Sequence, residues 1–195
     1  MNKSMVLALL VLPGVAAAAD HNEASGVVAD HIADIDDVYV WADGAKVVVA
    51  VTFGGPGADA KSTLGALDSG VLYGVHMDTN GDYLSDRDVW VRFGQNGAGA
   101  WGVQFAGIPG GSPTVEGAVD ASLSAGGSLM ARAGTFDDPF FFDFQGLLDT
   151  LGTGAVSFNS GRDSFAGQNV NAFIFEMDAA EFSGPFTVWA TSGRK

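Results

Sequence analysis

The sequence predicts an all-β protein, an antiparallel β-sandwich of about eight strands with one or two short helices. Short runs in which apolar and polar residues alternate, rich in Val, Phe, Tyr and Trp, recur between clusters of Gly, Asp, Asn and Ser. With 47% hydrophobic residues in a chain of 195, the protein can bury the core of one ordinary domain. No segment resembles a linker, so we expect residues 20–195 to form a single domain.

The first nineteen residues, 1–19, have the organisation of a secretory signal peptide. A short, positively charged start is followed by an apolar run over residues 5–12 and then by small residues that end at Ala19. The apolar run is too short to span a bilayer, for which about 20 residues are needed. We therefore expect cleavage after Ala19 and a periplasmic or extracellular protein that is not inserted in a membrane after cleavage.

Eight segments show the pattern of strands. Turn-forming residues around Gly44 and Asn96 join two pairs of these segments through hairpin-type connections, which predicts mostly antiparallel neighbours. The expected strands are residues 38–41, 46–53, 71–77, 88–93, 101–105, 129–134, 170–177 and 186–191.

Two segments between the expected strands are predicted to be helical, and one to be a long loop. Residues 145–151 and 179–182 have helical patterns, and a glycine follows each of them as a helix-ending residue. Both are expected to be connections rather than layers of the fold. The segment 107–128 is rich in small residues and is expected to be a loop.

Charge and cysteine content exclude several functional classes. The chain has 23 acidic and 9 basic side chains, a formal net charge of −14, and no cysteine. Disulfide scaffolds and cysteine-ligated zinc sites are therefore impossible, and nucleic acid or an anionic membrane surface would be repelled. Divalent cations are the expected partners, while a protein or glycan partner stays unknown. An exported protein without cysteine must gain its stability from its core or from bound ions.

The segment from Asp78 to Asp86 is the strongest candidate site. Asp78, Asn80 and Asp82 occupy positions 1, 3 and 5 of a short loop, Leu84 at position 7 can offer its backbone carbonyl, and Asp86 occupies position 9. Ca²⁺ takes about six to eight oxygen ligands at about 2.3 to 2.6 Å, and a loop that curls around the ion turns alternate side chains inward. The spacing therefore predicts a calcium site.

This loop is not an EF-hand, because Tyr83 stands at position 6 and Val89 at position 12, where that motif requires Gly and Glu. It resembles strand-flanked calcium loops with a D-x-D-x-D-G-x-x-D pattern, apart from Tyr83, and Asp88 is expected to cap it. The alternative is an acidic hairpin turn without metal. Four carboxylates without a counter-ion would repel one another by on the order of 1 kcal/mol per pair at ~4 Å, which favours calcium, with a Kd of about 10⁻⁴ to 10⁻³ M.

Three further groups of residues are weaker candidates for a metal site. His21 and His31 lie among many acids near the start of the mature chain, where the alternatives are a transition-metal site and a solvated arm. His76 precedes the loop on the same expected sheet face as Asp78. Asp137 and Asp138 precede Pro139 and a block of phenylalanines, for which a core plug is favoured over the wall of an ion-binding pocket.

Common catalytic patterns are absent or lack their context. The match to G-x-G-x-x-G over residues 97–102 is followed by an expected strand rather than a helix, so it indicates a turn. The sequence contains no G-x-S-x-G, P-loop or H-E-x-x-H pattern, and its three histidines are scattered. Carboxylate pairs are plentiful, as in glycosidases, but none is marked by its spacing.

Several segments together resemble an exported bacterial family catalogued as domain of unknown function 4331. The family has no established activity, so the resemblance implies one domain over most of the mature chain and no mechanism. It also favours a role for Asp137 and Asp138. The segments that carry it are the His21 region, residues 36–39, 73–82 with an H-x-D-x-N-G-D core, 137–141, 165–170 with an F-x-G-x-N-V core, and 188–191.

The sequence thus favours a secreted, non-catalytic, calcium-binding β-sandwich module. One alternative is a metal- or haem-associated periplasmic enzyme in which His21 or His31, His76 and the Asp137–Asp138 pair converge. Another is a subunit of an extracellular assembly.

Overall fold

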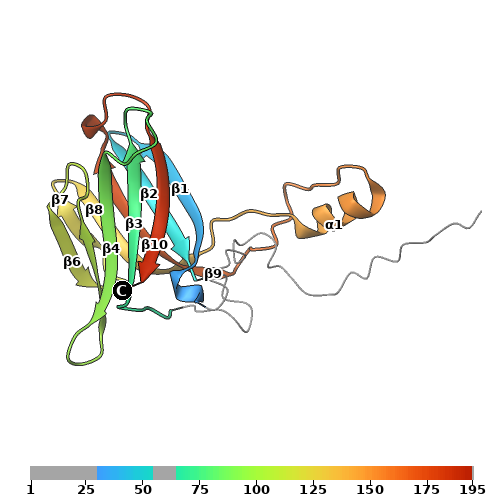
Figure 1. The fold of residues 1–195 in the computed structure, drawn as a ribbon. Coiled ribbons are helices and arrows are strands. Elements are labelled where there is room, and N and C mark those ends of the chain that lie inside the picture. The colour runs from blue at the N-terminus through green and yellow to red at the C-terminus, as the bar shows by residue number, and fades with distance from the viewer. Residues whose placement is uncertain (1–29, 55–64, 195) are drawn as a thin grey trace, which may run out of the picture.

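The protein is a sandwich of two antiparallel five-stranded sheets, as Figure 1 shows. The structure is a computed structural model and describes residues 30–54 and 65–194. The predicted signal peptide and His21 lie outside these residues. The all-β sandwich expected from the sequence is confirmed, with ten strands in the described residues in place of about eight.

The strands are ordered β1-β2-β9-β8-β7 in the first sheet, sheet A, and β10-β3-β4-β5-β6 in the second, sheet B. Each of the eight expected strands is present, most of them one to three residues longer than predicted. Their bounds are β1 Ile35–Asp43, β2 Lys46–Phe53, β3 Val71–Asp78, β4 Arg87–Gln95, β5 Trp101–Ala106, β6 Thr114–Ala118, β7 Leu123–Gly126, β8 Leu129–Asp137, β9 Asn169–Asp178 and β10 Thr187–Arg194. The helices are η1 His31–Ala33, α1 Phe144–Thr153 and η2 Ala179–Glu181.

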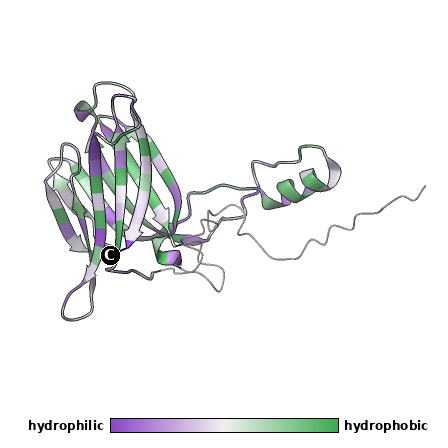
Figure 2. Ribbon diagram, in the orientation of Figure 1, coloured by the Kyte–Doolittle hydropathy of each residue, from purple (hydrophilic) through white to green (hydrophobic). Residues whose placement is uncertain are grey.

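The core lies between the two sheets and is filled by the inward side chains of both. Aromatic rings meet at its centre, where Tyr73 of β3 lies 4.8 Å from Phe53 of β2 and 5.5 Å from Phe173 of β9 between ring centroids. All three side chains are almost fully buried. Hydrophilic and hydrophobic residues alternate along β4 (Figure 2), because successive side chains of a strand point to opposite faces.

The expectation of a loop over residues 107–128 is wrong, because this segment contains β6 and β7. Both strands are short, β7 consists mainly of Ser, Ala and Gly, and β6 ends in Gly and Ala, which are small residues with little intrinsic preference for strands. They form at neighbouring edges of the two sheets by pairing with β5 and β8. Gly117 allows the close approach, since a Cβ atom there would lie 2.4 Å from a methyl carbon of Leu123.

A long excursion between β8 and β9, which we call the arm (residues 138–168), carries the predicted α-helix. In Figure 1 α1 stands beside the sandwich at the end of two extended connections. The helix begins after Asp143, whose side chain accepts a hydrogen bond from Gly146 N. It ends at Gly154 in the left-handed conformation (φ 71°), slightly later than Gly152, where the sequence pattern placed its end.

The phenylalanine block beside Asp137 and Asp138 does not plug the core, which corrects the preferred interpretation of this segment. The Phe141 side chain is 51% exposed, and its aromatic neighbours are only partly buried. Phe140 packs edge-on against Phe165 of the same arm, with ring centroids 5.2 Å apart. The block therefore stabilises the arm and not the interior of the sandwich.

Candidate functional site

The predicted calcium loop connects β3 and β4 at one end of sheet B. Met77 and Arg87 are the last paired residues of these two strands. Asp86 N donates a hydrogen bond to Met77 O at 2.9 Å, which closes the loop. The residues between Asp78 and Asp86 are exposed, whereas Asp78 itself is 1% exposed.

Asp78 organises the loop because its side chain accepts hydrogen bonds from backbone N–H groups of the loop. Its Oδ1 accepts from Asn80 N at 3.0 Å and from Gly81 N at 2.7 Å, and its Oδ2 accepts from Tyr83 N at 2.8 Å. Burial alone would raise the pKa of this carboxyl group, but the backbone donors outweigh burial and hold the pKa below its usual range. Asp78 is therefore a carboxylate at neutral pH.

Three of the predicted ligands form successive Asx turns at alternate positions. Asp78 accepts from Asn80 N, Asn80 Oδ1 accepts from Asp82 N at 2.9 Å, and Asp82 Oδ1 accepts from Leu84 N at 2.9 Å. Every second residue of the folded loop thus has the same local hydrogen-bonding geometry, which agrees with the spacing of two in the sequence.

Tyr83 takes the backbone conformation that a glycine would have at position 6. Its φ of 64° is left-handed, and Gly81 has a φ of 83°. A left-handed residue other than glycine costs about 1 to 2 kcal/mol. The sharp turn that the calcium-loop pattern requires therefore forms in spite of the missing glycine, and the Tyr83 side chain is 84% exposed.

Asp86 ties the two sides of the loop together. Its Oδ2 accepts from Thr79 Oγ1 at 2.6 Å and from Thr79 N at 2.8 Å, and its Oδ1 accepts from Asn80 Nδ2 at 3.0 Å. The bonds from Thr79 are the main reason why the Asp86 pKa is lowered. Among the described residues, no Lys, Arg or His forms an ion pair with Asp78, Asp82 or Asp86.

The carboxylates of the loop do not already converge on one point. In residues 30–54 and 65–194, no group of three or more His, Asp or Glu side chains is arranged to hold a metal ion. The loop oxygens face the N–H groups of the loop itself. A carboxylate oxygen that accepts one such bond keeps a further lone pair, so a cation could still be bound alongside these contacts.

Asp88 and His76, both predicted as weaker ligands, interact with each other on the outer face of sheet B. His76 Nδ1 lies 2.7 Å from Asp88 Oδ1, and Ser85 Oγ donates to the same oxygen at 2.5 Å. Both contacts lower the Asp88 pKa, that from Ser85 more strongly. The Asp88 carboxylate therefore binds His76 and Ser85, which differs from its predicted role as a cap over the loop.

Thr191 completes a row of polar side chains across three strands. Its Oγ1 lies 2.7 Å from His76 Nε2, so the row runs from Asp88 on β4 through His76 on β3 to β10. Thr191 could not be predicted as part of this row, because strand alternation shows which residues share a face but not which strands are neighbours.

This row has the order of groups found in Asp-His-hydroxyl triads but lacks their surroundings. The His76 ring lies 5.4 Å from each of the Trp90 and Trp189 rings. The N–H groups of a strand lie in the plane of its sheet, so the described face around Thr191 presents no pair of backbone donors for an oxyanion. What the structure shows of the row is that its side-chain contacts connect β4, β3 and β10.

Asp137 and Asp138 lie at the opposite end of the sandwich from His76. Asp137 pairs with Asn169 at the start of β9, and Asp138 Oδ1 accepts from Phe140 N at 2.9 Å. The ten residues of β9 span about 30 Å before η2 leads to Thr187, which pairs with Asp78. The structure thus does not bring His76 together with the Asp137–Asp138 pair.

The acids Asp34 and Asp36 near His31 are buried, which corrects the interpretation as a solvated arm for residues 30–37, while residues 20–29 of the same stretch lie outside the described residues. Asp34 and Asp36 are 5% and 6% exposed. Asp30 pairs with Arg194, which also contacts Asp68 at 2.7 Å, so this stretch is fixed against the end of β10. His31 lies in η1 at the same end.

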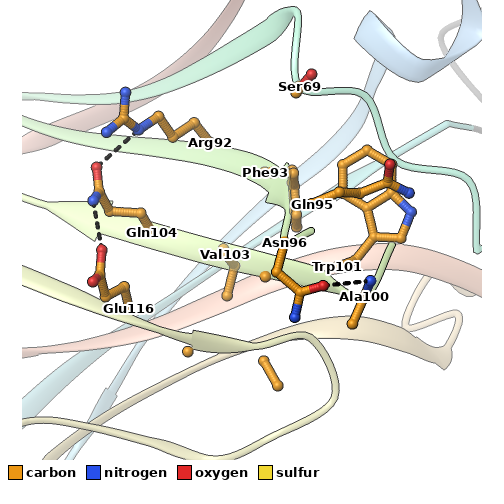
Figure 3. A pocket seen from close by; sticks show the side chains of 14 residues that line it. Ser69, Arg92, Phe93, Gln95, Asn96, Ala100, Trp101, Val103, Gln104 and Glu116 are labelled. Atoms are coloured by element: carbon orange, nitrogen blue, oxygen red, sulfur yellow. Dashed lines mark hydrogen bonds between the residues drawn. The ribbon is translucent and has the colours of Figure 1, made fainter. Parts of the chain in front are cut away.

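A shallow hollow of about 750 Å³ lies over β4, β5 and β6 of sheet B, and its lining includes Trp101. Figure 3 shows a row of three linked side chains in it: Arg92 Nε donates to Gln104 Oε1, and Gln104 Nε2 donates to Glu116 Oε2, both at 2.8 Å. We call Arg92, Gln104 and Glu116 the outer-face site. This site could not be predicted from the sequence, because its members come from three strands.

No family model, curated protein or solved structure matches the chain. The resemblance to domain of unknown function 4331 therefore stays a prediction. In the described part of the chain, no helix is long and apolar enough to cross a membrane.

Proposed function

We propose that the protein is a secreted, non-catalytic β-sandwich module that binds calcium through the loop from Asp78 to Asp86. The side chains of Asp78, Asn80, Asp82 and Asp86 and the carbonyl of Leu84 would be the ligands. The observation that carries the proposal is the series of three Asx turns, which gives alternate side chains of the loop the same local geometry.

The charge of the loop supports a cation as its ligand. Three carboxylates lie within nine residues without a described basic partner, and two of them have lowered pKa values. Asp78 and Asp86 are therefore charged at neutral pH, and repulsion between like charges in the loop favours a bound divalent ion. Oxygen ligands from carboxylates, an amide and a carbonyl are those that Ca²⁺ prefers.

Calcium would act as a stabilising link between β3 and β4. The loop closes this hairpin, and Ser85 connects it to the Asp88–His76–Thr191 row. A chain without cysteine has no disulfide to fix such a connection. A bound ion would therefore stabilise the end of the sandwich at which the loop lies.

The test is thermal unfolding of the purified protein in calcium and in EDTA. At free calcium about 100 times Kd, linkage predicts about 2.7 kcal/mol of added stability, which raises the Tm by several degrees. Asp82→Ala should lose most of this gain. Asp137→Ala, which removes an exposed acid at the other end of the molecule, should keep it. Coincident curves in calcium and EDTA at every concentration would contradict the proposal.

A further inference from the structure

We propose that two copies of this chain associate through strand β1, which pairs antiparallel with β1 of the second copy about a twofold axis at Val40. β1 is an edge strand, because it is the first strand of sheet A and pairs with β2 on one side. On its other side no described strand is hydrogen-bonded to it, so its backbone can accept another strand. The inference goes beyond calcium binding, since β1 contains none of the loop residues.

The middle of β1 exposes apolar side chains on both faces of the sheet. Val38 and Val40 lie opposite core residues of β2, yet they are 37% and 42% exposed and do not belong to the cluster that fills the core. Trp41, on the outer face, is 46% exposed. An edge strand that is apolar on both faces gains contact area on both faces when another strand is added to it.

The other edge strands of the two sheets are shorter or are in contact with a neighbouring element. β6 and β7 have five and four residues. β10 contacts η1, where Ser192 Oγ donates a hydrogen bond to Ala33 O. β1 has nine residues, and residues 38–42 within it include no charged residue and no proline, which are the features that usually protect an edge. β1 is therefore the edge best suited to pairing.

A bulge and flanking charges define the length of the segment that can pair. The register of β1 on β2 shifts between Ile35 and Val38, which places a β-bulge around Asp36 and Asp37. At the other end, β1 stops at Asp43. Bulges and charged side chains both oppose edge pairing, so the segment that can pair is residues 38–42.

This segment is complementary to itself. Opposite residues of an antiparallel pair lie on the same face of the sheet, so the twofold axis passes through one residue of the strand. With the axis at Val40, this residue lies opposite its own copy, and Val38 lies opposite Ala42 on the inner face. On the outer face Tyr39 lies opposite Trp41 twice. Aromatic and β-branched pairs of this kind stabilise sheets.

Pairing in this register also continues the apolar outer face of sheet A. Val48 and Ala50 of β2 lie opposite Trp41 and Tyr39. They are 6% and 7% exposed, although they do not belong to the core between the sheets. The outer face is therefore apolar as far as β1, where it ends at the exposed Trp41. In the pair of copies this apolar face runs on across the axis, which favours a second copy over an unrelated strand.

The charges of the chain predict how the association depends on salt. Asp37 and Asp43 flank the pairing segment, so the acids of one copy come near those of the other. Each copy also has a formal net charge of −14. Both effects are repulsive, and both are screened by salt, so the association should be stronger at about 1 M than at about 0.1 M NaCl. Association through ion pairs would show the opposite dependence.

The experiment is oxidative cross-linking of single-cysteine variants of the full chain, which has no cysteine of its own. At the axis, the two Cβ atoms of residue 40 would be about 4.5 to 5.5 Å apart, close to the distance that a disulfide spans. Val40→Cys should therefore form a cross-linked dimer about tenfold faster or more than the control Met130→Cys. Met130 lies on β8 of the same sheet and is similarly exposed, at 40%.

Val38→Cys tests the register. With the axis at Val40, the two copies of residue 38 are four residues apart along the strands, or about 13 Å, so this variant should cross-link slowly.

Light scattering over a range of protein concentrations provides a second measurement. The wild type should approach twice the mass of one chain, and Val40→Lys should raise the Kd of the dimer about tenfold or more, because it places two like charges at the axis. Val156→Lys, at an 82% exposed position of the arm, is the control and should change little.

Three results would overturn the proposal. The first is a wild type that stays monomeric at every concentration, or a dimer that salt weakens. The second is cross-linking of Val40→Cys that is no faster than that of Val38→Cys or Met130→Cys. The third is dissociation of the dimer by Val156→Lys as readily as by Val40→Lys, which would place the contact on the arm.

Discussion

Two excursions from the sandwich, the loop from Asp78 to Asp86 and the arm, are each organised by one buried aspartate. Asp78 is 1% exposed and Asp143 is 3% exposed. Each accepts hydrogen bonds from backbone N–H groups of the segment that follows it. In the arm these donors are Gly146 N at 2.9 Å and Asn159 N at 2.7 Å.

The two aspartates differ in whether a basic side chain forms an ion pair with them. Arg162 binds Asp143 with two bonds, from Nε at 2.6 Å and from Nη2 at 2.8 Å, and is the main reason why the Asp143 pKa falls to about 2. Asp78 has backbone donors but no described basic partner. The arm therefore contains its own cation, whereas the loop has a similar anionic centre without a described basic partner, and the proposed calcium ion would take that place.

The largest expected effect comes from removing the anionic centre of the arm. Asp143→Ala leaves the Arg162 guanidinium and two backbone N–H groups without their acceptor, so the arm should open locally while the sandwich stays folded. Cleavage of the arm by chymotrypsin should become about tenfold faster or more. Asp149→Ala, which removes an exposed acid only 3.9 Å from Arg162, is the control and should change little. Equal cleavage of both variants would argue against Asp143 as the centre of the arm.

An intermediate effect is expected from acid. The folded-state pKa of Asp143 is about 2, below the value of 3.8 for the free side chain, so its contribution to stability is present above pH 4 and is lost as the pH falls towards 2. At each pH, the rate of pepsin cleavage of the arm is measured for wild type and for Asp143→Asn. The ratio of the two rates does not contain the pH dependence of the protease itself. Wild type should be cleaved more slowly at pH 4 and at the same rate near pH 2. A ratio that stays constant over this range would show that Asp143 does not titrate as described.

The smallest effect concerns the left-handed residue of each excursion. The arm uses Gly154 at φ 71°, and the loop uses Tyr83 at φ 64°. Tyr83→Gly should relieve backbone strain and raise the free energy of unfolding in EDTA by about 1 kcal/mol, since few contacts of this exposed ring are lost. Gly154→Ala should have the opposite sign. Chemical denaturation in EDTA measures both, and a loss of stability in Tyr83→Gly would show that its ring makes contacts that matter.

Much of the fold could be predicted because its signals are local. The eight predicted strands have strong alternation of apolar residues, and the calcium-loop spacing lies within nine residues. β6 and β7 could not be found in this way, since their small residues form strands only through their partners on β5 and β8. The phenylalanine block was predicted to lie in the core but packs within the arm. Hydrophobicity alone does not show whether a segment enters the core or packs against its own neighbours in the chain.

The candidate sites were harder to predict from the sequence than the strands. Asp143 and Arg162 are 19 residues apart, and His76 and Thr191 are 115 residues apart, so neither pair has a sequence spacing that identifies it. The outer-face site depends on the register of β4, β5 and β6. Sequence alternation assigned each side chain to a face, but the order of strands in the sheet determines which side chains meet.

The ion pair between Asp30 and Arg194 holds these two residues together at the end of the sandwich that lies away from the loop. It joins the start of the described chain to the end of β10, where Arg194 pairs with Val71. From Val71, β3 runs about 25 Å to the loop at Asp78 (Figure 1). A tether attached beyond either Asp30 or Arg194 would therefore leave from one end of the sandwich and hold the loop outward, which makes the two attachment points equivalent for immobilised binding assays.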